Sequence, residues 1–215
     1  MILAEHLYSS REQLAIALAQ RLSDAVRRRD GGVLALSGGS TPKAMLATLA
    51  ATPTPWDRTT LTLVDDRCVD AEDPRSNRRL LNETLLAPLG PAAPEFQPLY
   101  QDSERLAPLP LNIAVLGMGE DGHTASLFPK APELKALLGP DAPAAGFATA
   151  TQPPLVRRAS YSAAALAAAD LLILHIEGPR KRAIYEAAKT SAAEQYPIAQ
   201  FLQQQSAALE LYWAA

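Results

Sequence analysis

The stretch VLALSGGSTP, residues 33–42, joins a short apolar run to a loop of small polar residues. The run Val33–Leu36 is typical of a strand buried in a parallel sheet, since such a strand is covered on both faces. Pro42 suits the first turn of a helix, where the N–H that proline lacks would have no partner. The stretch therefore predicts a strand, a loop and a helix in succession, which is the repeating pattern of an α/β fold.

The same alternation continues along the chain. Further strands are expected at residues 60–64, 112–116, 147–151, 156–161, 171–176 and 209–213. Helices are expected from the capping box Ser9–Glu12 to Arg29, after the capping residue Ser76, and at residues 163–169 and 178–189. This order predicts an α/β fold with a mainly parallel sheet covered by helices on both faces. The length of 215 residues and the lack of a convincing linker favour a single domain, residues 1–215.

Composition excludes several classes of function. Hydrophobic residues make up 48% and charged residues 20%, as in ordinary globular proteins. The formal net charge of -3 provides no general positive field, so nucleic acid and acidic membranes are not expected partners. Cys68 is the single cysteine, the first residues do not resemble a signal peptide, and no apolar stretch reaches the roughly 20 residues of a membrane span. We therefore expect a cytoplasmic protein.

The loop Ser37–Thr41 has the composition of an anion-binding loop. Its residues are Ser37, Gly38, Gly39, Ser40 and Thr41. Glycines let backbone N–H groups approach a ligand closely, hydroxyls add hydrogen-bond donors, and the N-terminus of the next helix attracts anions. A Walker A loop would end in Gly-Lys-Ser/Thr, which is missing here. The loop suits one phosphate group, although an ordinary strand-to-helix turn would look similar.

A second glycine-rich segment, Gly117–Gly122, matches the dinucleotide pattern G-x-G-x-x-G. Dinucleotide binding is disfavoured, because Glu120 and Asp121 would place negative charge beside a pyrophosphate and Pro129 would end the helix early. The better interpretation centres on His123. An imidazole takes up a proton near neutral pH, and a carboxylate such as Asp121 can orient its ring.

Three basic residues complete the set of candidates. Arg67 follows the expected strand 60–64, Arg158 lies in an arginine pair, and Lys181 begins an expected helix. Arginine grips phosphate or carboxylate through two hydrogen bonds, whereas lysine acts as a point charge. No histidine, cysteine and carboxylate spacing indicates a metal, and no G-x-S-x-G motif indicates a serine esterase. The histidines at positions 6 and 175 are expected to be structural.

The loops after the strands ending at Leu36, Val64 and Leu116 lie at strand carboxyl ends. In open α/β sheets, ligands bind beyond these ends. The sequence therefore predicts that the three loops meet in one crevice.

These motifs resemble those of the 6-phosphogluconolactonases. The matching segments are residues 36–42, Asp65–Arg67, Ser76–Asn77, residues 117–129, Arg158-x-Ser160 and Gly178-x-x-Lys181, and they cover residues 33–200 in order. The wider group includes the glucosamine-6-phosphate deaminases, which share the Ser-Gly-Gly-Ser-Thr and Asp-Gly-His elements. The Thr-Ala-Ser-Leu-Phe-Pro sequence after His123 is similar to the lactonase branch.

The resemblance implies a Rossmann-like three-layer fold and hydrolysis of 6-phospho-D-glucono-1,5-lactone to 6-phosphogluconate, a step of the oxidative pentose phosphate pathway. It implies that His123 activates water, that Asp121 supports it and that Arg67 lies near the reacting carbonyl. Asp65 and the loop 37–41 would bind substrate, and Arg158 and Lys181 would hold the phosphate, although which of the two contacts it stays open. Asp66 stands where the family usually has Glu, so its role is open.

No cofactor and no metal are expected, and a monomer is favoured. Two alternatives remain at this point: a deaminase or isomerase acting on an amino sugar phosphate, and a non-catalytic sensor of a sugar phosphate. Release of ammonia from glucosamine 6-phosphate would identify the first. The second would need a partner-binding module, for which the chain offers no obvious segment.

Overall fold

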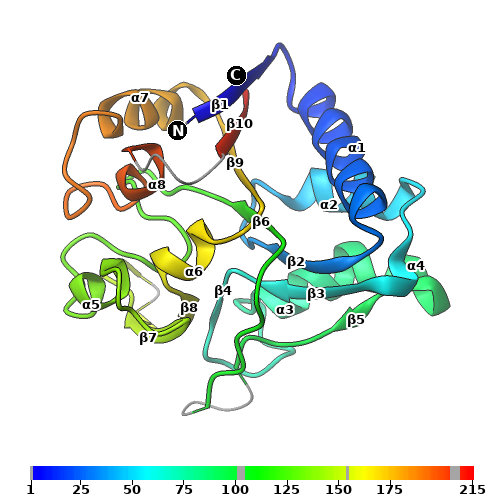
Figure 1. Cartoon of the computed structure of the whole chain (residues 1–215), viewed down its shortest axis with the longest axis horizontal. Helices are drawn as coiled ribbons and strands as arrows, with labels where there is room; N and C mark the ends of the chain where they lie inside the picture. The colour runs from blue at the N-terminus through cyan, green and yellow to red at the C-terminus, as the bar shows by residue number, and fades with distance from the viewer. Residues whose placement is uncertain (1, 101–104, 154, 204–208) are drawn as a thin grey trace.

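A computed structural model describes residues 2–100, 105–153, 155–203 and 209–215 (Figure 1). Its main sheet is parallel throughout, with the strand order β1-β10-β9-β6-β2-β3-β5. The bounds of these strands are β1 (Ile2–Tyr8), β2 (Gly32–Leu36), β3 (Thr59–Leu63), β5 (Glu95–Phe96), β6 (Ile113–Leu116), β9 (Leu171–Glu177) and β10 (Leu209–Ala214). The predicted α/β fold with a mainly parallel sheet is confirmed.

Helices cover both faces of this sheet (Figure 1). On one face lie α1 (Arg11–Arg29), α2 (Lys43–Ala51) and α3 (Asn77–Leu81), which runs on through the π-helical turn η2 (Asn82–Leu86) into α4 (Ala87–Leu89). On the other lie α5 (Leu134–Leu138), α6 (Ala163–Ala167), α7 (Pro179–Ala188) and α8 (Ala199–Gln203). Two 3₁₀ turns, η1 (Trp56–Arg58) and η3 (Gly90–Ala92), complete the described helices.

Strand β6 shows why a central strand of this sheet is apolar at every position. Ile113 and Val115 belong to the core beneath α1 and α2, whereas Ala114 and Leu116 belong to the core on the opposite face. Successive side chains of a strand point to opposite faces, so a central strand of a three-layer fold must be apolar throughout. The apolar run 113–116 is therefore continuous rather than alternating.

A second, antiparallel sheet differs from the expectation. It pairs β4 (Asp65–Arg67) with β8 (Arg157–Tyr161), and β8 with β7 (Ala145–Thr149). Strands were expected at 147–151 and 156–161, close to β7 and β8, but as part of the alternating pattern of the parallel sheet. The two strands are joined by a short segment, which allows only antiparallel pairing.

Several local expectations need correction. Helix α1 is capped by Ser10, whose side chain accepts a hydrogen bond from Gln13 N, and not by Ser9. Ser9 Oγ instead donates to the Gln13 side chain. The edge strands β1 and β5 were not predicted, because neither carries a distinctive apolar run. The cap at Ser76 is confirmed, since its side chain accepts from Arg79 N.

The order of the strands places a crevice at the carboxyl ends of β2 and β6. After β2 the chain adds β3 and then β5 on one side, and after β6 it adds β9 and β10 on the other. The connections leaving these two neighbouring strands therefore run in opposite directions. Such a switch point leaves room between the loops, and ligands bind there in open α/β sheets.

Asp66 ties the start of α3 to this edge of the sheet. Its Oδ1 accepts hydrogen bonds from Arg67 N and Asn77 N, both at 2.7 Å, and its Oδ2 accepts from Arg78 N at 3.3 Å. Burial raises the pKa of Asp66 to about 6, because the loss of solvent outweighs these hydrogen bonds. The role of Asp66, which the sequence left open, is thus structural. Its carboxylate holds the backbone N–H groups of the residues that carry the Arg67 and Asn77 side chains.

The raised pKa predicts how stability depends on pH. Between the ordinary value of 3.8 and about 6, the folded protein keeps a proton on Asp66 that the unfolded chain has lost. The free energy of unfolding therefore falls as pH rises through this window, and Asn at this position removes that loss. Urea unfolding at pH 4 and pH 7 measures this effect. Between these two pH values, the free energy of unfolding of Asp66→Asn should rise by about 3 kcal/mol relative to that of the wild type. Parallel pH profiles for the two proteins would contradict this assignment.

Candidate active site

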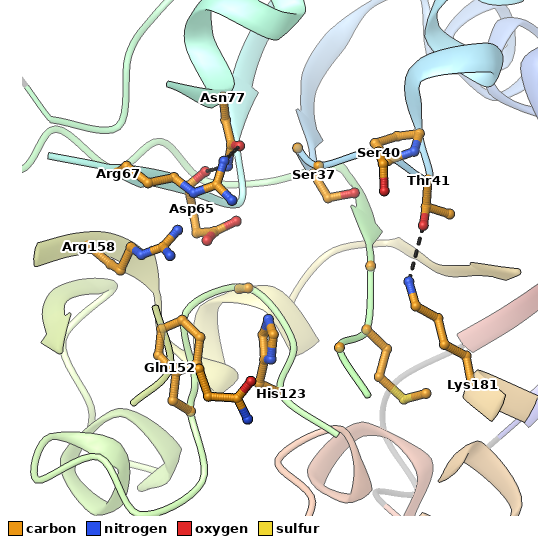
Figure 2. A pocket seen from close by; sticks show the side chains of 18 of the residues that line it. Ser37, Ser40, Thr41, Asp65, Arg67, Asn77, His123, Gln152, Arg158 and Lys181 are labelled. Carbon is orange, nitrogen blue, oxygen red and sulfur yellow. Dashed lines mark hydrogen bonds between the residues drawn. The ribbon is translucent and has the colours of Figure 1, made fainter. Parts of the chain in front are cut away.

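A cavity of about 300 Å³ opens at the carboxyl ends of β2 and β6 (Figure 2). The three loops predicted to meet there do so, and the start of α7 joins them. The lining residues come from segments far apart in the sequence: Ser37, Gly38, Gly39, Ser40, Thr41, Pro42, Asp65, Arg67, Asn77, Gly117, Met118, Gly119, His123, Ala125, Phe128, Gln152, Pro153, Arg158 and Lys181. All predicted site residues except Asp121 are among them.

His123, which lines the cavity, forms a tight pair with Asp121. His123 Nδ1 lies 2.5 Å from Asp121 Oδ1, which also accepts from His123 N at 3.1 Å. Burial by itself would raise the pKa of Asp121, but the hydrogen bonds from His123 outweigh it and hold the pKa below its usual value. A carboxylate can only accept, so Nδ1 is the nitrogen that donates in this pair, and in the neutral imidazole Nε2 is then the nitrogen that can accept a proton.

Close packing fixes the imidazole. A Cβ atom on Gly119 would come within 2.2 Å of the His123 ring, so only glycine fits there. On another side the Phe128 ring lies 4.7 Å from the imidazole, centroid to centroid. The glycine that matched the dinucleotide pattern therefore makes room for the histidine.

Arg67 is held by neutral oxygen atoms at the opposite wall. Its guanidinium donates to Arg75 O at 2.9 Å and to Asn77 Oδ1. Asn77 is buried, and its amide nitrogen donates to Asp65 O at 3.0 Å. A Cβ atom on Gly38 would come within 2.0 Å of Asn77 Oδ1, so this glycine is also required by close approach. Asn77 thereby links the loop Ser37–Thr41 to Arg67.

Arg158 lies beside Arg67. The two are register partners in the β4–β8 pair, and the guanidinium of Arg158 lies 5.6 Å from the centre of the Phe128 ring. Burial lowers the pKa of Arg158, and the charge of Arg67 adds to this effect. Asp65 lines the cavity near both, with its Oδ2 accepting from the buried Ser126 hydroxyl at 2.6 Å.

Lys181 lies at the other end of the cavity, next to the loop Ser37–Thr41 (Figure 2). Its Nζ donates to Thr41 Oγ1 at 3.1 Å. Burial lowers the pKa of Lys181, although the charges of Glu177 and Glu120 oppose the effect. Deeper in the loop, Ser37 Oγ is buried and has no hydrogen-bond partner among the described residues. A ligand with several acceptor oxygens would satisfy the donors gathered here.

Sequence reasoning missed Gln152 and Phe128, and it gave Asn77 no role of its own. Gln152 lies between β7 and β8, and its Nε2 contacts Asp121 Oδ2 at 3.4 Å. These residues reach the cavity through tertiary packing, and a single sequence carries no local signal for that. Asn77 excludes any side chain at Gly38, but this close contact is visible only in the structure.

The cavity offers donors and an imidazole rather than metal ligands. Across residues 2–100, 105–153, 155–203 and 209–215, no group of three histidine, cysteine or carboxylate side chains is arranged to hold a metal ion. In the same ranges no helix combines the length and apolar character needed to cross a membrane.

Comparisons with known proteins agree with this geometry. Residues 8–213 match the model of the family glucosamine-6-phosphate isomerases/6-phosphogluconolactonase. The chain is 38% identical to a 6-phosphogluconolactonase of Rhizobium meliloti (strain 1021), covering 97% of both proteins. It is 36% identical to that of Pseudomonas putida, covering 93% of this chain and 86% of the relative.

Solved structures extend the match to three dimensions. A putative 6-phosphogluconolactonase from Neisseria gonorrhoeae FA 1090 covers 100% of both chains with a TM-score of 0.90 and 30% identity. A monomeric glucosamine-6-phosphate deaminase shares the fold alone, with a TM-score of 0.79 and 13% identity over 98% of this chain and 97% of its own. The chain belongs to the family of the glucosamine-6-phosphate isomerases and 6-phosphogluconolactonases.

Proposed function

We propose that this protein hydrolyses 6-phospho-D-glucono-1,5-lactone to 6-phosphogluconate. The observation that carries the proposal is the Asp121–His123 pair, which presents a free imidazole nitrogen to a cavity flanked by cationic side chains. The relatives named 6-phosphogluconolactonase, at 36–38% identity, support the same substrate. The protein acts, in this proposal, in the cytoplasm and as a single domain. Its single cysteine, Cys68, leaves no internal disulfide that would need an oxidising compartment.

The substrate phosphate binds, in this proposal, at the end formed by Ser37–Thr41 and Lys181. Support comes from the hydroxyls of Ser40 and Thr41, the bond between Lys181 and Thr41, and the start of α2 nearby. The lactone carbonyl then lies near Arg67, on the far side of His123. Anchoring one end of the ring orients its carbonyl toward the base, and such orientation lowers the barrier.

His123 acts as general base and then as general acid. Its Nε2 takes a proton from water while the water oxygen bonds to C1, and the cation of Arg67 stabilises the developing oxyanion. The bond between C1 and the ring oxygen then breaks, and the imidazolium gives its proton to the departing oxygen. Asp121 stabilises the imidazolium between these steps. The balance is lactone plus water giving an acid, with no cofactor.

Activity should depend on the substrate phosphate. Unphosphorylated gluconolactone loses the contacts with the loop and Lys181, so its kcat/KM should be lower by about 10²-fold or more. Lys181→Met should lower kcat/KM for the phosphorylated lactone alone. A pH-stat assay corrected for spontaneous hydrolysis measures both lactones, and equal specificity constants would rule out this anchor. No ammonia should appear from glucosamine 6-phosphate in the same preparation.

Removing the imidazole should strongly lower kcat without unfolding the protein. His123→Ala should lower kcat by about 10² to 10⁴-fold, since that is the usual contribution of a general base. His6→Ala is the matched control, because His6 lies on β1, is absent from the cavity lining, and should keep full activity. The assignment would be lost if the His123 variant kept more than half of the wild-type turnover.

Turnover should persist after removal of divalent ions. A catalytic zinc normally needs three protein ligands, and His123 and Asp121 would have to abandon their pairing to supply two. Exhaustive dialysis against a chelator should therefore leave kcat unchanged. If chelation stopped turnover and one equivalent of a divalent ion restored it, metal-bound hydroxide would replace the imidazole as the base.

A further inference from the structure

The cavity has two cationic ends, with His123 between them (Figure 2). One end carries Arg67 and Arg158, brought together by the register of β4 and β8. The other carries Lys181, bonded to Thr41. A substrate with a single phosphate needs only one of these ends for charge pairing.

The arginine end lacks a contacting counter-ion. Within the described ranges, neither Arg67 nor Arg158 lies within 4.0 Å of a carboxylate oxygen, and the Arg67 guanidinium donates to two neutral oxygens, Arg75 O and Asn77 Oδ1. Two carboxylates lie nearby without contacting the guanidinium groups: Asp65 Oδ2 accepts from Ser126, and Asp66 accepts from backbone N–H groups. Their charges favour the Arg158 cation, but burial and the charge of Arg67 outweigh them. The Nε atoms of both arginines are buried and unpartnered among the described residues. An added anion stabilises two neighbouring cations, here the buried Arg158 and the half-buried Arg67.

Hydrolysis creates such an anion. The ester bond of the lactone breaks, the water oxygen remains on C1, and at neutral pH the new acid releases one proton. The lactone has one anionic group, its phosphate, whereas the product has a phosphate and a carboxylate. The carboxylate forms where the carbonyl was, at the arginine end.

We propose that the product is held at both ends at once, its carboxylate by Arg67 and Arg158 and its phosphate by Lys181 and the loop 37–41. This inference rests on the proposed function and extends it. The open-chain acid then binds more tightly than the lactone and competes with it. Steady turnover requires a following reaction that consumes the phosphorylated sugar acid.

Three stable compounds separate the two ends: 6-phosphogluconate carries both anions, glucitol 6-phosphate only the phosphate, and gluconate only the carboxylate. Calorimetry measures their Kd values for the wild-type protein, and inhibition of lactone hydrolysis measures their Ki values. The dissociation constant of 6-phosphogluconate should be at least about tenfold lower than that of glucitol 6-phosphate, as a charge-assisted pair provides. Equal constants would overturn the proposal.

Two variants assign the ends. Arg158→Met should raise the Kd of 6-phosphogluconate close to that of glucitol 6-phosphate, whose own Kd should change by less than about twofold. Lys181→Met should weaken both ligands by a similar factor and preserve their ratio. The unchanged binding of glucitol 6-phosphate reports that Arg158→Met is folded, and Arg67→Gln repeats the test if it is not. Equal weakening of both ligands by Arg158→Met would place the phosphate at Arg158 and overturn the proposal.

The calorimetric arm distinguishes this inference from the proposed function. If the proposed function is wrong, the protein will not hydrolyse the lactone, whatever the binding constants are. Failure of the present inference would appear as active hydrolysis with no advantage of 6-phosphogluconate over glucitol 6-phosphate.

Discussion

The parallel pairing of β2 with β6 is the constraint on which the site depends. These strands are neighbours in the sheet although about 80 residues separate them in sequence, and the chain departs from their carboxyl ends in opposite directions. The loop after β2 places Ser37–Thr41 at the cavity, and the loop after β6 places His123 there. Were the two strands separated by another, the imidazole and the phosphate loop would face different crevices.

Polar side chains lock these loops together. Asn77 contacts Arg67 and Asp65 and excludes any side chain at Gly38, while Asp66 holds the backbone that carries Asn77. Each of these contacts joins residues from different elements, so the position of Arg67 depends on the start of α3 as much as on β4. The site is thus built on the rigid edge of the sheet, which suits a reaction that relies on orientation.

The local parts of this arrangement could be predicted from the sequence. The apolar run before Ser37, the glycine loop and the Asp121–His123 spacing are each contained in a few residues, so the strand ends and the positions of these loops followed directly. The chemical roles of the loops stay predictions. The proximity of Arg158 to Arg67 could not be predicted, because it arises from the antiparallel register of a separate sheet. Gln152 was missed for the same reason. The cap of α1 was misplaced by one residue, since Ser9 and Ser10 can both accept at a helix start.

In the proposed mechanism, His123 presents an unprotonated Nε2 to the substrate because Asp121 holds the proton on Nδ1. Nitrogen NMR of the labelled ring measures this directly, since the two nitrogens have different chemical shifts when protonated and unprotonated. At the pH of activity we expect a protonated Nδ1 and an unprotonated Nε2, and a loss of that preference in Asp121→Asn. A proton found on Nε2 in the wild-type protein at that pH would contradict the role of His123 as general base.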